Sequence, residues 1–452
     1  MAKNPNSKLA QQTLHAFNEA LNSGNFAEVR QMLRGMGAAE IAFLIESSPP
    51  RSRNILWKLV DRDTEGEILQ YLHEEIAAEF LRHRDTKDII SAVEEFDVDD
   101  AADLLQELPR SVTTKILDAM DDQNRQRIEA VLSYDEDTAG GLMNPESITV
   151  RPDITLEVVL RYMRLHEELP DMTDSIMVVN RADQFVGVIP LTKLLVSDPA
   201  MSVRDAMRTD VTAIPSDTPA SEVAKIFERQ DLITAPVVDS DGRLVGRVTI
   251  DDVVDVIREE GDHSLMSMAG LDEDEDTFAP VLKTTKRRSV WLGINLLTAL
   301  LASGVIGLFE ATLDKVVALA VLMPIVASMG GIAGSQTLTL VIRGMALGHV
   351  GPSNTRWLLS RELAVGALNG VLWSLVIGLV ASVWFNDYQL GGIIASAMVI
   401  NLVIAAVAGA SLPLILDKLG IDPALSGGVV LTTVTDVVGF FAFLGLATAF
   451  YM

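Results

Sequence analysis

The stretch "LTTVTDVVGFF", residues 431–441, places a single carboxylate, Asp436, inside the most apolar part of the chain. No Lys or Arg lies near it in the sequence, and the apolar segment around it is long enough to cross a hydrocarbon layer of roughly 30 Å. A carboxylate at that depth costs about 2.5–3.5 kcal/mol even on the milder insertion scale. We therefore predict a membrane-embedded fold in which Asp436 faces protein or water.

The surroundings of Asp436 are small and polar on one side of the expected helix. Gly428, Thr432, Asp436 and Gly439 follow one another at spacings of four, four and three, which places them on one face. One interpretation is a protonated Asp that hydrogen-bonds a neighbouring helix. The other is an ion site on a pore axis, because hard cations take oxygen ligands. We favour the ion site, with Asp436 and Thr432 as ligands, and two copies of Asp436 in a symmetric dimer would suit a divalent cation.

Five apolar segments of membrane-spanning length fill the last part of the chain. Basic residues cluster before the first segment and recur between the second and third, and a single Lys418 lies between the fourth and fifth, which predicts a cytoplasmic N-terminus and an outside C-terminus. The opening "MAKNPNSKLAQQ" lacks an apolar signal-peptide core. We expect a multi-pass protein of the plasma (inner) membrane, with spans near 289–310, 316–342, 363–385, 390–416 and 424–451.

The second span contains "MPIVASMGGIAGSQTLTL", residues 323–340, which combines a helix-bending proline with glycines and polar residues at bilayer depth. It is either a packing motif or a broken, pore-lining helix. Asn401 in the fourth span is a weaker candidate, for which we favour interhelical hydrogen bonding over a place in the pore. Glu362 beside Arg361 reads as an interfacial ion pair. The pore-lining candidates are Gly331, Gly334, Ser335, Gln336, Asn401 and Gly439.

Charge separates the chain into two parts. Residues 281–452 hold nine Lys/Arg and seven Asp/Glu, which leaves 27 Lys/Arg and 55 Asp/Glu for residues 1–280. So acidic a part argues against nucleic acid and anionic headgroups as partners and favours cations. The chain has no Cys, and its six His residues show no metal-ligand spacing, so disulfides, thiolate sites and a zinc site are not expected.

The acidic part contains two kinds of repeat. Residues 1–135 read as successive short helices, and Leu44 and Pro49 recur 60 residues later as Leu104 and Pro109, which suggests an α-superhelix. From about residue 147, two copies of a helix–strand–strand–helix pattern follow, with strands at "SIMVVN", "FVGVIP", "APVVDS" and "LVGRVTI". The predicted domains are 1–135 (helical), 136–205 and 206–250 (α/β pair), 251–280 (connecting helix and acidic linker) and 281–452 (five-helix membrane domain).

The connecting helix carries an acidic stripe at three-and-four spacing, and the segment "EEFDVDDAADLL", residues 94–105, is acidic too. A solvated face is the plain interpretation. However, like charges at i,i+4 destabilise a helix, and packing two acidic surfaces together requires counterions. We predict that Mg²⁺, held by carboxylates partly through its waters, bridges them and that low Mg²⁺ lets them separate. The sensor candidates are Asp99, Asp100, Asp103, Asp252, Asp255, Glu259, Glu260 and Asp262.

No hydrolase or kinase constellation and no GxxxxGK[ST] phosphate loop occurs in the sequence, so an enzyme is not expected. "GRVTIDD", residues 246–252, has the form of a ribose-contact pattern through Thr249 and Asp252. The first copy has Pro190 in place of the Thr. The sequence thus predicts at most one nucleotide site.

Taken together, the helical repeat, the paired α/β units, the charged connecting helix and the five spans resemble the MgtE family of magnesium channels. The repeated units resemble CBS domains. The most specific motifs are "MPIVASMGGIAGSQTLTLVIRG" and "TDVVGFF". The resemblance implies a homodimer with the pore at the subunit interface, a selectivity site at Asp436, a connecting helix that plugs the pore, closure by cytoplasmic Mg²⁺, and ATP binding in the CBS pair. This chain departs from the family by Ile332 where Asn is usual, and by His263 and Ser264 where acids are common.

The expected function is therefore passive Mg²⁺ influx gated by cytoplasmic Mg²⁺. Two alternatives remain open. One is transport of another divalent cation, such as Co²⁺ or Mn²⁺, because oxygen ligands select weakly among small divalent ions. The other is a membrane-anchored CBS sensor without transport.

Overall fold

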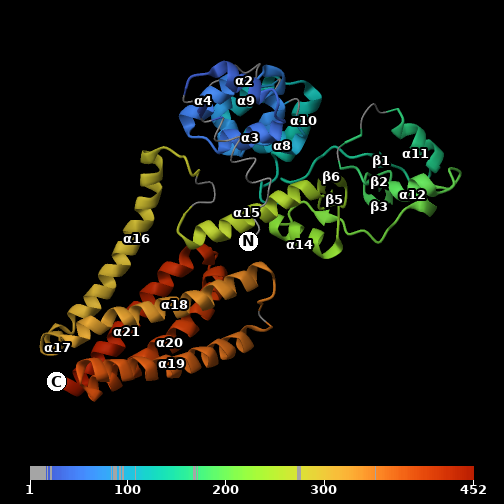
Figure 1. The fold of residues 1–452 in the computed structure, drawn as a ribbon. Coiled ribbons are helices and arrows are strands. Elements are labelled where there is room, and N and C mark those ends of the chain that lie inside the picture. The colour runs from blue at the N-terminus through green and yellow to red at the C-terminus, as the bar shows by residue number, and fades with distance from the viewer. Residues whose placement is uncertain are drawn as a thin grey trace. The chain divides into compact units, whose positions relative to one another are not determined.

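The fold is drawn in Figure 1 from a computed structural model. The chain forms two compact units, Met1–Glu260 with Asp276–Ala279, and Gly261–Glu275 with Pro280–Met452, which are described separately. The structure describes residues 17, 19–20, 23–82, 84, 89–90, 93, 96–106, 108–165, 169–170, 172–271, 276–351 and 353–452.

The first unit begins with the predicted succession of short helices. Leu44 and Leu104 are both buried in one continuous core, and Pro49 and Pro109 each stand directly before a helix in extended backbone. A proline there ends one helix and presets the first turn of the next, so the 60-residue repeat in sequence is a repeat in structure. The helices are α2 (Phe26–Leu33), α3 (Ala38–Glu46), α4 (Pro50–Leu59), α5 (Glu65–Gln70), α6 (Glu74–Leu81), α8 (Val98–Gln106), α9 (Arg110–Ala119) and α10 (Asp122–Val131), with a 3₁₀ turn at Arg62–Thr64.

Two three-stranded sheets follow, in the orders β1-β2-β3 and β4-β5-β6. In each sheet the last two strands form an antiparallel pair, and a two-residue strand joins the first of them in parallel. The four predicted strands are confirmed, whereas β1 and β4 are too short to show alternation and were missed. The elements are β1 (Thr149–Val150), α11 (Leu156–Met163), β2 (Ser175–Val179), β3 (Phe185–Pro190), α12 (Leu191–Val196), α13 (Val203–Ala206), β4 (Ile214–Pro215), α14 (Ala220–Gln230), β5 (Thr234–Val238), β6 (Leu244–Thr249) and α15 (Ile250–Met268).

The segment that leads into each sheet packs on the other sheet. Met143 lies in the core around β5 and β6, and Val203 lies in the core around β2 and β3. The two glycines that align in the repeat permit this exchange. A Cβ at Gly187 would lie 2.3 Å from the carbonyl oxygen of Arg208, and one at Gly246 would lie 2.8 Å from that of Asn144. Only glycine allows the crossing backbones to approach so closely.

Helix α15 is continuous from the second sheet into the connecting segment. Val253 and Val256, near its start, are buried in the core of the second sheet. The predicted connecting helix is therefore also the final helix of the second α/β repeat.

The second unit contains the membrane domain, which is entirely helical: α16 (Val281–Gly307), α17 (Glu310–Lys315), α18 (Ala318–Ala346), α19 (Thr355–Phe385), α20 (Tyr388–Lys418) and α21 (Pro423–Tyr451). Five helices of the described part are long and apolar enough to cross a membrane, as predicted. Helices α16 and α19 begin eight residues before their predicted starts, because basic and polar residues continue the same helix ahead of the apolar window. Helix α20 packs against α18, α19 and α21.

Small residues allow the close contact of α18 with α20. A Cβ added at Gly409 of α20 would lie 2.6 Å from the carbonyl oxygen of Gly334 on α18. Such glycine contacts are the usual means by which membrane helices approach closely, since lipid supplies no hydrophobic force between them.

Candidate cation sites

Asp436 lies on the partly open face of α21. Thr432, one turn earlier, is exposed and Asp436 is half-buried, whereas Thr435, on the adjoining side of the helix, is fully buried. The structure gives the Asp436 carboxylate no hydrogen bond or ion pair with another described residue. The Thr432 hydroxyl donates to the carbonyl oxygens of Gly428 (3.1 Å) and Val429 (3.0 Å). Its proton is therefore directed into the helix, which leaves oxygen lone pairs available to a cation.

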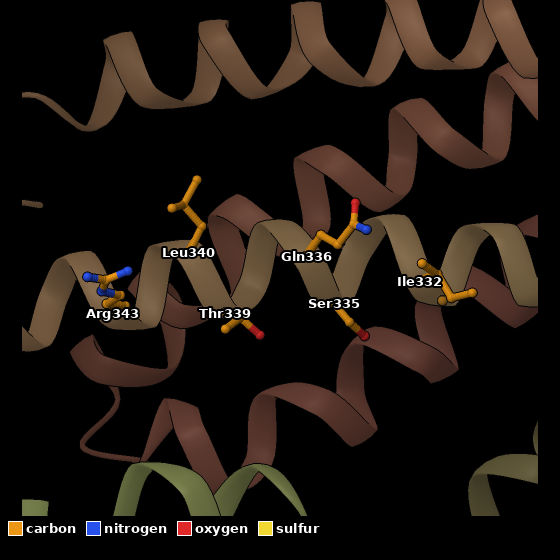
Figure 2. Close-up of a pocket in the computed structure, with 7 residues that line it drawn as sticks. Ile332, Ser335, Gln336, Thr339, Leu340 and Arg343 are labelled. Carbon is orange, nitrogen blue, oxygen red and sulfur yellow. The ribbon is translucent and has the colours of Figure 1, made fainter. Parts of the chain in front are cut away.

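Helix α18 presents a groove of about 600 Å³. Figure 2 shows Ser335 and Thr339, one turn apart, projecting from the same side of the helix. Gln336 also lies on the groove, and all three polar residues are exposed. Ile332 is exposed and lines the groove, so an apolar side chain stands among these polar groups. The lining residues are Gly331, Ile332, Ser335, Gln336, Thr339, Leu340 and Arg343.

Three predicted pore-lining residues lie instead inside the helix bundle. Asn401 is fully buried, and its Nδ2 donates to the carbonyl oxygen of Val326 at 2.8 Å. A Cβ at Gly439 would lie 2.8 Å from the same Nδ2, and one at Gly334 would lie 2.9 Å from a methyl group of Leu431. Among the described residues, these contacts hold α18, α20 and α21 together.

Glu362 of α19 is buried among the helices of the membrane domain. The predicted ion pair with Arg361 is present, but the Glu362 carboxylate is buried and accepts a hydrogen bond from Thr337 Oγ1 of α18 at 3.2 Å. The pair with Arg361 could be predicted because the two residues are neighbours in the sequence. The contact with Thr337 could not, because Thr337 lies 25 residues away on another helix.

In the first unit, carboxylates from α8 and α15 approach one another. Asp99 of α8 is buried and accepts a hydrogen bond from Asn144 Nδ2 at 3.2 Å. Burial raises its pKa well above the ordinary value, and the charge of Asp252 on α15 adds to the rise. Burial also raises the pKa of Asp252 to about 7, although Thr249, whose hydroxyl donates to this carboxylate at 2.7 Å, opposes the rise. Two carboxylates held this way favour a shared proton or a cation.

The remaining sensor candidates surround this pair or lie further along α15. Removal from water, with repulsion from neighbouring carboxylates, raises the pKa of Asp100 to about 6, and burial raises that of Asp255. Asp103 is half-buried, while Glu259, Glu260 and Asp262 are exposed. Among the described residues, no group of three or more acidic or His side chains is already arranged to hold a metal. A bridging ion would therefore be held partly through its waters.

The predicted nucleotide contacts bond to each other. The Thr249 backbone N–H donates to Asp252 at 3.3 Å, in addition to the hydroxyl bond. Thr249 is buried, and Asp252 takes part in the acidic cluster as well. A nucleotide at these two residues remains a prediction.

The fold and these sites define a multi-pass membrane protein whose acidic α/β and helical regions are suited to cations. Family models match as follows: "Divalent cation transporter" over residues 323–446, "MgtE intracellular N domain" over 36–137, and "CBS domain" over 139–197 and 203–259. The magnesium transporter MgtE of Thermus thermophilus is 32% identical over 95% of this chain and 96% of its own length. That of Bacillus subtilis is 28% identical over 95% of both chains.

Among solved structures, the cytosolic domain of the Mg²⁺ channel MgtE in complex with ATP is 33% identical, with a TM-score of 0.48. It matches over 54% of this chain and 99% of its own. On the family models and the full-length relatives, the chain belongs to the MgtE family of magnesium transporters. The family consists of transporters, not enzymes.

Proposed function

We propose that this protein carries Mg²⁺ passively into the cytoplasm through a pore at a homodimer interface. The observation that carries the proposal is Asp436, a carboxylate in the middle of the apolar helix α21 that no described cationic side chain neutralises. An ionised carboxylate there needs a compensating charge. A permeating divalent cation, with Thr432 as a neighbouring oxygen ligand, supplies it.

A second subunit would cover the polar surface of the membrane domain. Ser335, Gln336 and Thr339 of α18 and Thr432 of α21 are exposed within predicted spans. Polar groups facing hydrocarbon are costly, so such a surface faces protein or water. Symmetric pairing through these faces would bring two Asp436 carboxylates to one axis and leave a hydrated path along the groove.

The driving force needs no coupled reaction. With the cytoplasm at −100 mV, a divalent cation gains about 4.6 kcal/mol on entry, since each charge contributes about 2.3 kcal/mol. The proposal requires the basic ends of the spans, including those near residues 283–288, to face the cytoplasm. The helical and CBS regions then sample the cytoplasmic Mg²⁺ concentration.

Regulation would act through the acidic cluster of Asp99 and Asp252. A cation between α8 and α15 removes their repulsion and holds the helical region on the CBS pair. Loss of the cation restores the repulsion. High cytoplasmic Mg²⁺ would thus favour the closed state, which limits influx when the ion is plentiful.

Mg²⁺ uptake into vesicles that contain the purified protein tests the transport site. Asp436→Asn is expected to reduce uptake at least about tenfold, the effect of losing about 1.4 kcal/mol of cation stabilisation. Asp417→Asn, at the exposed end of α20, is the matched control and should transport normally. Unchanged uptake by Asp436→Asn would contradict the pore assignment, and no uptake by the intact wild-type dimer would favour the sensor alternative. Competition with Co²⁺ and Mn²⁺ in the same assay determines the cation.

ATP binding to the CBS pair is a separate part of the proposal. Its support is the Thr249–Asp252 arrangement next to β6. ATP should raise the unfolding temperature of the wild type but not that of Thr249→Val, whose side chain cannot donate a hydrogen bond. An equal rise in unfolding temperature in both proteins would exclude Thr249 as an ATP contact.

A further inference from the structure

Arg53, on α4 of the helical region, is a buried cation that holds a distant segment of the chain. Its guanidinium forms a bidentate pair with Asp276, with Nη1–Oδ2 at 2.6 Å and Nη2–Oδ1 at 2.9 Å. Only 3% of the Arg53 side chain is exposed. The two residues are 223 positions apart, so the contact joins the helical region to the linker that follows α15.

The same guanidinium is positioned by the end of α3. Arg53 Nε donates to the carbonyl oxygen of Ile45 at 3.1 Å, and Nη2 donates to that of Glu46 at 2.9 Å. Carbonyls at a helix C-terminus lack intrahelical partners and carry partial negative charge, so they suit a cation. The backbone thus fixes the guanidinium with its remaining donors directed at one carboxylate.

Residues 276–279 form a turn at this contact. The Phe278 backbone N–H donates to Asp276 Oδ1 at 2.9 Å, and the Phe278 ring lies with its centroid 5.9 Å from Arg53 Cζ. Such a distance is within the range of a cation–π contact. Residues 276–278 therefore present a carboxylate and an aromatic ring to the same guanidinium.

We propose that the Arg53 site is a docking site for residues 276–278, which ties the helical region to the start of the first membrane span. Pro280 follows two residues after Phe278 and is the N-cap residue of α16. When residues 276–278 bind to Arg53, the chain that leads into α16 is held in place, and when they dissociate it can move. This restraint acts on α16 independently of α15. Its effect on transport rests on the proposed function, whereas the docking itself does not.

The bond geometry predicts that the site requires an Arg and a carboxylate. Lys carries the charge but cannot form the planar two-bond fork. Removing Asp276 leaves the buried guanidinium without its carboxylate, which has a cost of its own. Asp276→Asn nevertheless keeps Arg53 and its bonds to the end of α3, whereas Arg53→Lys disturbs those bonds as well.

Hydrogen exchange in the full-length protein tests the docking. Asp276→Asn and Arg53→Lys should speed exchange of the Phe278 amide at least about tenfold, and in Asp276→Asn, which keeps Arg53, exchange in the core helix α3 should stay unchanged. Arg34→Lys is the matched control, because Arg34 pairs with Asp61 on the exposed surface of the same region. The double variant should exchange no faster than the single ones, since both remove one interaction. Unchanged exchange in Asp276→Asn would overturn the docking site.

Uptake at low and high internal Mg²⁺ tests the coupling to α16. Asp276→Asn should raise uptake at high internal Mg²⁺ by at least about threefold and leave uptake at low Mg²⁺ unchanged. Faster exchange with unchanged uptake at both concentrations would overturn the coupling and leave the docking established. Failure of Asp436→Asn to reduce uptake would instead overturn the transport proposal without affecting the exchange result.

Discussion

Asn401 of α20 and Gly330 of α18 fit together so closely that a Cβ at Gly330 would lie 2.3 Å from Asn401 Nδ2. The amide that fills this space also donates to the carbonyl oxygen of Val326, one turn earlier on α18. It approaches Gly439 of α21 from the other side. One buried side chain thus links the helix that lines the groove to the helix that carries Asp436.

Substitution of Gly330 should therefore destabilise the membrane domain. Gly330→Ala forces α18 and α20 apart or displaces the Asn401 amide, at a cost of about 1–3 kcal/mol. Gly331→Ala is the matched control, because nothing lies within 4 Å of its added Cβ, and Ala favours the helix. Thermal unfolding in detergent should show a lower midpoint for the first variant only. Equal midpoints would contradict the contact.

Loss of the Asn401 amide should disturb both stability and transport. Asn401→Ala removes the bond to Val326 and leaves a cavity between two glycines, which should cost about 2–4 kcal/mol. Because α18 and α21 would lose their common contact, uptake should fall even in the fraction that remains folded. Ser396→Ala on the same helix is the control, since Ser396 is exposed and, in the described part of the chain, its hydroxyl bonds only to the carbonyl oxygen of Gly392 on its own helix. The measurements are unfolding midpoint and uptake per folded protein.

The acidic cluster should make the packing of α8 against α15 depend on pH when Mg²⁺ is absent. The folded pKa of Asp252, about 7, exceeds the ordinary value of about 3.9, so the folded state binds the proton more tightly. Protonation of Asp252 therefore stabilises the folded state fully below about pH 4, and this stabilisation is lost as the pH rises through 7. Protease resistance of the cytosolic region without Mg²⁺ should thus increase between pH 8 and 6. In Asp252→Asn this increase should be much smaller, and an unaltered increase would exclude Asp252 as its source.

At pH 8, millimolar Mg²⁺ should replace the proton in stabilising the packing of α8 against α15. Limited proteolysis should slow on addition of Mg²⁺ in the wild type and respond less in Asp99→Asn, which removes the buried charge. Asp122→Asn, in an exposed pair with Arg125, is a control that should retain the full response. Identical digestion patterns with and without Mg²⁺ would contradict the sensor.

The sequence predicted the regular elements well where a local pattern repeats over many residues. Five apolar segments became five long helices, and alternating runs became β2, β3, β5 and β6. It missed β1 and β4, because two residues show no period. At the candidate sites, the spacing of Thr432 and Asp436 predicted their common open face. The same reasoning placed Gly439 on that face, but a neighbouring helix covers it with Asn401.

The sequence by itself thus determined which segments form helices or strands, the internal repeats, and the free-energy cost of placing Asp436 in an apolar segment. It could do so because the length of an apolar segment, its periodicity and its charge are local properties. Only the tertiary structure decided which of the polar residues are covered by other helices. It also placed Asp99 near Asp252. In the same way, it brought Arg53 into an ion pair with Asp276. These contacts join residues tens to hundreds of positions apart. They depend on close packing of whole elements, which no local pattern in the chain records.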